Sequence, residues 1–415
     1  MKKLKILFIL PPHASDFFSF KDPSWGIIRI PPFSLISLGS YLYGKGYTVK
    51  IVDCRELIYK HKTNNYIPFL LEIVNDFRPE VVGINILTAL FYEARRISFK
   101  LKSKFPDITL IVGGPHPSVE PLLTFKQNQY IDAICIGPGE EVCLDILSGK
   151  IITNIPGLMH REYIENFIYR SPEIDIDKFP FPNYDLVNKE YYTDFTLNTL
   201  TGWGFKGIAT LTSRSCPYSC KFCASDWSKP FRYHSADYVI SLAKYLSTYK
   251  IDAITFIDDT LAAIKERLNK ICEGFIREKI FWPYSNLRWF AAIRANQADP
   301  DILKQMKDAG CFGVSVGIES GSDRMLKVLN KITTVEMNKR AYKYINEAGL
   351  YLGASFMLGI PGETYEDMCE TIAFIKETNS NSKGLGIFRP LPGSPFYDEF
   401  IKKTCYLKKI LIGKI

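Results

Sequence analysis

The sequence predicts an α/β protein with two parts, a doubly wound parallel sheet followed by a partial β/α barrel of six strands. Two series of short apolar segments alternate with segments of helical spacing, and a proline-rich stretch separates the two series. The chain has 415 residues, more than one domain of about 100–200 residues needs. Its hydrophobic fraction of 47% is enough to bury two cores and excludes a disordered chain.

The first series predicts a parallel sheet covered on both faces, because its strands are almost continuously apolar. The predicted strands are Leu4–Leu10, Thr48–Asp53, Val81–Ile86, Ile108–Val112 and Ala133–Ile136. The predicted helices are Phe33–Lys45, Tyr66–Phe77, Ala89–Lys104 and Glu140–Leu147. A ligand crevice is expected beyond the carboxyl ends of such strands.

The middle of the chain, from about Asn154 to Thr201, is rich in Pro, Tyr, Asn and Asp. Phe179-Pro-Phe-Pro182 lies in its centre, and such a stretch cannot sustain a long helix. We therefore expect a linker that runs over the surface between two domains.

The second series predicts the barrel, whose ligand site would lie at the carboxyl ends of its strands. The predicted strands are Gly207–Thr212, Ala253–Ile257, Leu287–Ile293, Gly313–Ile318, Tyr351–Met357 and Gly384–Phe388. The predicted helices are Ala236–Tyr249, Lys265–Lys279, Pro300–Ala309, Thr334–Ala348 and Thr364–Glu377. The expected division is a first domain at 1–150, a linker at 151–201, the barrel at 202–395 and a basic tail at 396–415.

Charge and hydropathy restrict the partners. The net charge of +8 comes from 52 basic and 44 acidic residues spread along the chain, which indicates a solvated surface and not a nucleic-acid site. The apolar runs are far shorter than the ~20 residues of a membrane helix. The first run ends at Pro11-Pro12 without a cleavage site, so we predict a buried strand and a cytoplasmic protein without a membrane span.

Three of the ten cysteines are candidates for metal ligands. Cys216, Cys220 and Cys223 directly follow the first strand of the second series, whereas the other seven lie singly in apolar or helical contexts typical of structural thiols. A cubane with three cysteine ligands leaves one iron open for an outside ligand. The alternative is a zinc site with His234 as fourth ligand, but the paired spacings usual for zinc are not evident.

The C-x3-C-x2-C spacing, with aromatic Phe222 before the last cysteine, resembles the signature loop of the radical S-adenosylmethionine (SAM) superfamily. The resemblance covers about residues 205–395. It implies a [4Fe–4S] cluster on Cys216, Cys220 and Cys223, with SAM bound to the open iron. It also implies cleavage of SAM to a 5′-deoxyadenosyl radical, for which the cofactors carry the chemistry and the protein supplies position and shelter.

Four further residues close successive strands of the second series, namely Asp258, Arg294, Glu319 and Gly359. The resemblance places all four, together with Phe222, in the SAM site. It implies that Phe222 packs near the adenine and that Glu319 bonds the ribose or the amino-acid portion of SAM. Arg294 would meet the SAM carboxylate, and the turn at Gly359 would let the backbone approach the adenine.

The first domain resembles the Rossmann-like cobalamin-binding domain that precedes many radical SAM enzymes. The likeness rests on Gly113-Gly-Pro-His-Pro117 and Ile136-Gly-Pro-Gly-Glu-Glu141, which follow the fourth and fifth strands. It implies a cobalamin site that includes Thr88, Gly113, Gly114, His116, Gly137 and Glu140. The Asp-x-His-x-x-Gly motif of many cobalamin proteins is absent, as it commonly is in class B radical SAM methyltransferases and their relatives.

The resemblances imply cobalamin-dependent methyl transfer to an unactivated carbon. They imply a small-molecule or lipid-like substrate and an external electron donor of the flavodoxin or ferredoxin type. Two alternatives stay open at this point. One is a radical SAM oxidoreductase, lyase or methylthio-type transferase without cobalamin, in a domain that has lost the cofactor. The other is a non-enzymatic iron–sulfur or zinc scaffold.

Overall fold

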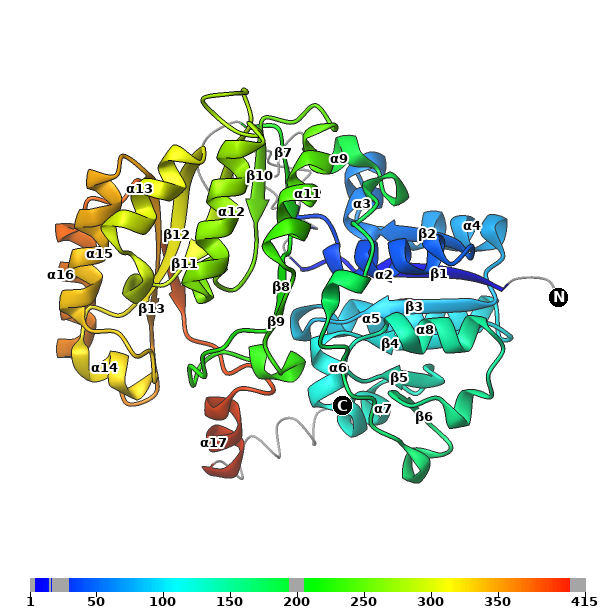
Figure 1. Cartoon of the computed structure of the whole chain (residues 1–415). Helices are drawn as coiled ribbons and strands as arrows, with labels where there is room; N and C mark the ends of the chain where they lie inside the picture. Colours follow the sequence, from blue (N-terminus) through cyan, green and yellow to red (C-terminus); the bar gives the residue numbers. More distant parts are fainter. Residues whose placement is uncertain (1–3, 15, 17–29, 194–204, 404–415) are drawn as a thin grey trace.

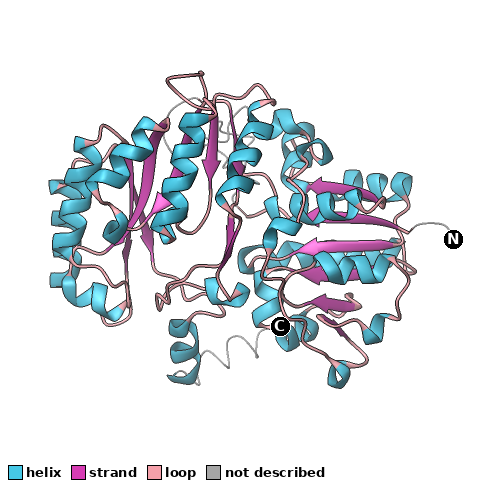
Figure 2. Cartoon of the chain, viewed as in Figure 1, coloured by secondary structure: helices cyan, strands magenta, loops and turns pink. Residues whose placement is uncertain are grey.

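The computed structural model describes residues 4–14, 16, 30–193 and 205–403, which form two sheets of six strands side by side (Figure 1). Helices cover both faces of the N-terminal sheet and the outer face of the C-terminal one (Figure 2). The predicted fold class, a doubly wound sheet followed by a partial barrel, is confirmed. Among the described residues, no helix is both long and apolar enough to span a membrane.

The N-terminal sheet has the strand order β2-β1-β3-β4-β5-β6, and its first five strands are parallel. Its strands are β1 (Lys5–Leu10), β2 (Thr48–Asp53), β3 (Val81–Asn85), β4 (Thr109–Gly113), β5 (Ala133–Cys135) and β6 (Leu158–His160). Its helices are α2 (Phe33–Gly44), α3 (Cys54–His61), α4 (Ile67–Phe77), α5 (Phe91–Lys104), α6 (Pro115–Val119), α7 (Pro121–Gln127) and α8 (Glu140–Leu147).

Strand β1 shows why these strands are apolar throughout. Ile6 and Phe8 enter the core on one face of the sheet, whereas Leu7 and Ile9 enter the core on the other. Because successive side chains of a strand point to opposite faces, a sheet covered on both sides has no polar alternation.

The C-terminal sheet is parallel, with the order β14-β13-β12-β11-β10-β7, and is open between its edge strands β14 and β7. Its strands are β7 (Gly207–Thr210), β10 (Ala253–Phe256), β11 (Arg288–Ile293), β12 (Cys311–Glu319), β13 (Tyr351–Leu358) and β14 (Ser382–Ile387). Its helices are α11 (Ala236–Ser247), α12 (Lys265–Arg277), α13 (Pro300–Asp308), α14 (Asp323–Val328), α15 (Val335–Glu347) and α16 (Tyr365–Glu377). A ribbon of β8 (Ser213–Arg214) and β9 (Arg232–Tyr233) extends beyond β7.

The stretch between the sheets contains more regular structure than the predicted linker at 151–201. Strand β6 pairs antiparallel with β5 and so extends the first sheet, and α9 (Lys189–Thr193) follows several short turns. Three residues are too few for a periodic signal, which is why β6 is not evident in the sequence. The last described helix, α17 (Pro395–Lys403), begins at the end of the predicted barrel; residues 194–204 and 404–415 lie outside the described parts.

Candidate functional site

The three candidate ligands share one loop after β8, here called the cysteine loop (residues 216–223). Cys220 is 7% exposed, and Cys216 and Cys223 are half-buried. The loop is fastened to the end of α14 by two hydrogen bonds. The Lys221 amide donates to the Leu329 carbonyl at 2.9 Å, and the Asn330 side chain donates to the Ser219 carbonyl at 2.8 Å.

The surroundings of these sulfurs fit thiolate ligands of a cluster. Arg294 Nη1 lies 3.3 Å from Cys220 Sγ, and an N–H donor of this kind stabilises a thiolate. Burial raises the pKa of the Cys216 thiol, so this thiol would lose its proton only when it binds iron. Among the described residues, no three His, Cys, Asp or Glu side chains already converge on a metal position.

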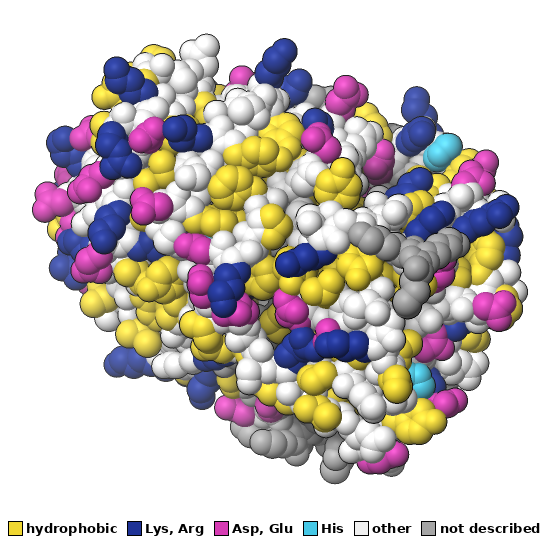
Figure 3. Space-filling view, turned by 45° about the vertical axis from the view of Figure 1, so that its right-hand side comes forward, with side chains coloured by type: hydrophobic (Ala, Val, Ile, Leu, Met, Phe, Trp, Pro, Cys, Tyr) yellow, Lys and Arg dark blue, Asp and Glu magenta, His cyan; other side chains and the backbone are white. Residues whose placement is uncertain are grey.

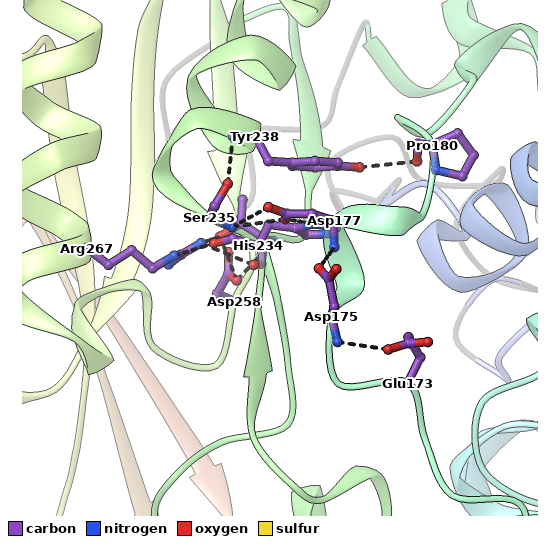
Figure 4. A network of polar contacts seen from close by, with 10 residues as sticks. Glu173, Asp175, Asp177, Pro180, His234, Ser235, Tyr238, Asp258 and Arg267 are labelled. Atoms are coloured by element: carbon purple, nitrogen blue, oxygen red, sulfur yellow. Dashed lines mark hydrogen bonds and ion pairs between the residues drawn. The ribbon is translucent and has the colours of Figure 1, made fainter.

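His234 belongs to another network, shown in Figure 4. Its Nδ1 lies 3.0 Å from Asp177 Oδ1, and its ring stacks on Tyr238 with the centroids 3.7 Å apart. Burial lowers the pKa of His234 to about 4, against the opposing effect of Asp177. This environment gives no support to the zinc alternative, in which His234 would be a metal ligand.

Asp258 lies in the same network of polar contacts (Figure 4). It is 1% exposed, and its Oδ1 accepts bonds from the Thr212 amide and hydroxyl, both at 3.0 Å, and from the Ser213 hydroxyl. Burial raises the pKa of this carboxyl. Asp258 thus ties the end of β10 to the chain after β7, whereas the next residue, Asp259, faces a cavity.

The structure brings three of the predicted SAM-site residues together around Lys331. Glu319 Oε1 lies 2.9 Å from Lys331 Nζ, which is also 5.7 Å from the centre of the Phe222 ring. Arg294 donates its second Nη to the Lys331 carbonyl. Lys331 was not predicted, since nothing in the spacing of the sequence marks a lysine twelve residues after Glu319.

Gly359 lies in a turn that a carboxylate organises. It has a φ of 76°, a conformation that favours glycine, and Glu363 Oε2 accepts bonds from the amides of Gly359 at 2.6 Å and Ile360 at 3.2 Å. Ile360 and Phe222 pack in one small apolar cluster, so this turn approaches the cysteine loop. Glu363 is a second residue of this region that is not among the predicted site residues.

A cavity of about 520 Å³ lies between the two sheets. Four of the six residues predicted for cobalamin line it, and residues of the cysteine loop region line it from the barrel side. The first group is Gly113, Gly114, Gly137 and Glu140, and the second includes Cys223, Ala224, Ser225 and Asp259. The lining is mostly apolar, as expected for a site that holds a large organic cofactor.

At two glycines, the wall of this cavity on the side of the first sheet consists of backbone alone. A Cβ at Gly114 would lie 2.3 Å from Asn85 Oδ1, and its φ of 105° also favours glycine. Gly137 has a φ of 82°, and a Cβ there would meet nothing within 4 Å. The wall at Gly137 is therefore open to a flat ligand that lies against the backbone.

Arg214 and Glu140 form an ion pair across the cavity, with Nη2 and Oε1 2.6 Å apart. Burial opposes ionisation of Glu140, yet Arg214 holds the pKa of this carboxyl below its usual value. The guanidinium carbon also lies 4.8 Å from the centre of the Phe179 ring. The pair connects α8 of the first sheet to the ribbon after β7, and neither sheet alone supplies both partners.

Thr88 and His116 are not among the described residues that line the cavity. They contact each other, with Thr88 Oγ1 3.2 Å from His116 Nδ1. Burial lowers the pKa of His116 to about 4, and its buried Nε2 has no partner among the described residues. Their placement in a cobalamin site remains a prediction.

The surface in Figure 3 carries Lys and Arg side chains interspersed with Asp and Glu, with apolar side chains between them. The described side chains on this face do not form a continuous basic tract of the kind that binds nucleic acid.

Known sequences match both halves of the chain. The Radical SAM superfamily matches residues 210–375, and the B12 binding domain matches residues 29–147. An uncharacterized methyltransferase of Pyrococcus horikoshii, PH0819, is 30% identical over 98% of this chain and 85% of its own length. An anaerobic magnesium-protoporphyrin IX monomethyl ester cyclase of Rubrivivax gelatinosus is 25% identical over 97% of this chain and 71% of its own.

Two solved structures share the fold. The radical SAM methyltransferase TsrM of Kitasatospora setae, with cobalamin and a [4Fe–4S] cluster bound, superposes with a TM-score of 0.76 at 18% identity, over 97% of this chain and 75% of its own. The cobalamin-dependent SAM radical enzyme OxsB superposes with a TM-score of 0.71 at 18% identity, over 98% of this chain and 56% of its own. These two structures share the fold, and the sequence matches to the Radical SAM superfamily, to the B12 binding domain and to PH0819 show the family. The chain is an enzyme of the radical SAM superfamily, in the group that carries an N-terminal B12-binding domain.

Proposed function

We propose that this enzyme transfers a methyl group to an unactivated carbon of a small organic substrate, with a [4Fe–4S] cluster, SAM and cobalamin as cofactors. One observation carries the proposal. The glycine-lined wall of the first sheet and Cys223 of the cysteine loop line the same cavity. A cobalamin bound against Gly114 and Gly137 would therefore share one cavity with the cluster and the substrate.

Within this proposal, SAM with the reduced cluster supplies the radical chemistry and cobalamin supplies a methyl group. The chain holds the cluster through Cys216, Cys220 and Cys223. Arg294 donates a hydrogen bond to one of these sulfurs. The mostly apolar lining offers water few hydrogen-bond partners near the reacting atoms.

Two residues that line the cavity are suited to orient the substrate. Arg214 presents a cation that Glu140 neutralises in part, at 2.6 Å. Asp259 faces the cavity, and burial, with the Asp258 charge, raises the pKa of its carboxyl. These groups suit a mostly apolar molecule with a few polar substituents, such as a lipid-like intermediate.

The proposed reaction also requires an external one-electron donor, of the flavodoxin or ferredoxin type, and a reducing compartment. The nine described cysteines are free thiols, as is usual in the cytoplasm, where we place the enzyme.

The test is anaerobic reconstitution with iron, sulfide and hydroxocobalamin, followed by metal analysis and incubation with methyl-labelled SAM and a reductant. We expect about four irons and one cobalt per chain, together with deoxyadenosine and labelled cobalamin. A Cys220→Ala variant is the control and must lose SAM cleavage. Iron without cobalt would support the cobalamin-free alternative. Absence of both metals would contradict both readings.

A further inference from the structure

Two arginines lie opposite each other on the ribbon beyond β7. Arg214 of β8 pairs with Arg232 of β9 in antiparallel register, and both residues line the cavity between the sheets. Side chains directly opposite in such a pair have Cβ atoms about 4.5–5.5 Å apart, and two like charges at this spacing destabilise the pairing. The ribbon therefore concentrates positive charge on one wall of the cavity.

Arg232 is a buried cation without a carboxylate of its own. It is only 3% exposed. Among the described residues, its guanidinium donates to backbone carbonyls alone, those of Pro230 at 3.1 Å, Glu173 at 3.2 Å and Ser228 at 2.9 Å. Burying a charge is costly unless an opposite charge compensates it, and a guanidinium has further N–H donors to offer.

Two carboxylates line the cavity, and together they do not balance the arginines. Although burial opposes ionisation of Glu140, Arg214 and, more weakly, Arg232 hold the pKa of this carboxyl below its usual value. One carboxylate is thus shared by two cations. Asp259 does not join them, because burial and the Asp258 charge raise the pKa of its carboxyl without an opposing effect from either arginine. One positive charge is left over on this wall.

The remainder of the cavity lining is mostly apolar, with Phe8, Leu38 and Ile84 among its side chains. The planar guanidinium group is suited to carboxylate and phosphate oxygens, which it binds through charge-assisted hydrogen bonds. An apolar space with a cationic group on one wall therefore fits an organic anion that has an apolar body.

We propose that Arg214 and Arg232 bind an anionic group of the substrate, a carboxylate or a phosphate, while the apolar body of the substrate lies in the cavity. The substrate class is then an amphiphilic organic anion. Glu140 competes with the anionic group for Arg214. The inference rests on the proposed function, because it takes this cavity to hold the substrate beside the cofactors.

The experiment uses the full chain, reconstituted anaerobically with iron, sulfide and hydroxocobalamin. The probes are octyl phosphate and octanoate, and octanol is the neutral probe with the same alkyl chain. Calorimetric titration measures the dissociation constant of each probe. Arg232→Met removes one cation, and Glu140→Gln removes the competing charge. Arg277→Met is the matched control, since Arg277 is 65% exposed and pairs with Glu278 at 3.4 Å.

We expect wild type to bind octyl phosphate and octanoate about tenfold or more tightly than octanol, because a charge-assisted hydrogen bond is added. Arg232→Met should lose most of this preference and keep its affinity for octanol. Glu140→Gln should bind octyl phosphate about threefold or more tightly than wild type, because Arg214 is then available to the probe. Arg277→Met should match wild type. Since the two cavity variants change the affinity in opposite directions, a general loss of folding cannot imitate both results.

Equal affinity of wild type for octanol and octyl phosphate would overturn the inference, as would an unchanged preference in both cavity variants. The phosphate of cobalamin is a competing source of the anion. If Arg232→Met weakens the binding of hydroxocobalamin but not of cobinamide, which lacks that phosphate, the arginines serve the cofactor and the assignment to the substrate is wrong. Failure of the proposed function gives a different result, since wild type would keep its preference for anions but form neither deoxyadenosine nor labelled cobalamin.

Discussion

Arg294 closes β11 with a guanidinium that is only 6% exposed. Its Nη atoms donate to Cys220 Sγ and to the Lys331 carbonyl, and its carbon lies 3.9 Å from the centre of the Tyr218 ring. Only Nε is left buried without a partner among the described residues. The sequence resemblance assigns this arginine to the SAM carboxylate, but its contacts in the structure are mainly with the cysteine loop.

Replacing Arg294 with Met should therefore shift the reduction potential of the cluster to more negative values, because a cationic donor to a thiolate favours the added electron. A preference of about 1.4 kcal/mol for the reduced form corresponds to about 60 mV for one electron. A redox titration followed by electron paramagnetic resonance measures the shift. Arg288→Met on the same strand is the control, since Arg288 stacks on Trp282 at 4.7 Å. An unchanged potential would contradict this role.

His116 makes stability depend on pH. Burial lowers its pKa from 6.5 to about 4, so between these values the unfolded chain binds the proton and the folded chain does not. The apparent free energy of unfolding should therefore fall as the pH drops from 6.5 toward 4, by up to about 1.4 kcal/mol per unit from this group. Urea unfolding at several pH values tests this, and His116→Gln should flatten the slope. If exposed His61→Gln flattens it equally, the assignment is wrong.

At the scale of elements, the chain at the start of α17, residues 393–396, fastens the cysteine loop. The Phe396 amide donates to the Lys221 carbonyl at 3.1 Å, and the Phe396 ring, 4% exposed, packs with Phe222 in one apolar cluster. Before it, a Cβ at Gly393 would lie 2.8 Å from the Val119 side chain of α6. This segment thus contacts both the cysteine loop and the first sheet's helices.

Phe396→Ala should loosen the cysteine loop, since truncation of a buried phenylalanine leaves a cavity that costs about 3–5 kcal/mol. We expect the cluster to bleach faster in the presence of a chelator, with the fold otherwise retained. Absorbance decay under anaerobic conditions measures the rate. Phe400→Ala, at a residue that is 42% exposed on the same helix, is the control. Equal decay in wild type and Phe396→Ala would show that the ring does not support the loop.

The elements themselves were largely predictable. Thr48–Asp53 and Glu140–Leu147 begin and end where the pattern predicts. An apolar run of this length indicates a buried strand, and apolar residues at helical spacing indicate the buried face of a helix. The short elements were not predictable, since β6 and the β8–β9 ribbon have too few residues to show a periodic pattern of apolar side chains. A local motif likewise predicted the three cysteines as candidate ligands. Lys331, in contrast, lies beside the cysteine loop because of the turn after α14, in which Asn330 and Ile332 have positive φ values.

At the scale of the whole molecule, the cavity arises from how two sheets are placed against each other. The glycines after β4 and β5 were predictable as strand-end residues, but their juxtaposition with Cys223 was not, because no local pattern encodes the placement of one sheet on another. The Arg214–Glu140 pair shows the same limit, since its partners are 74 residues apart and belong to different sheets. A site between domains is the part of the molecule that sequence patterns predict least.

The shared cavity predicts that one substitution can abolish cobalamin binding without loss of the iron–sulfur cluster. Ser37 of α2 lines the cavity, whereas Tyr43 of the same helix is 58% exposed. Ser37→Trp should fill space that the corrin needs, and Tyr43→Trp should not. After reconstitution with iron, sulfide and hydroxocobalamin, we expect Ser37→Trp to lose cobalt while it keeps about four irons, since the cysteine loop lies on the opposite wall. Full cobalt retention would place cobalamin elsewhere, and parallel loss of iron would mean that the two walls of the cavity form as one cooperative unit.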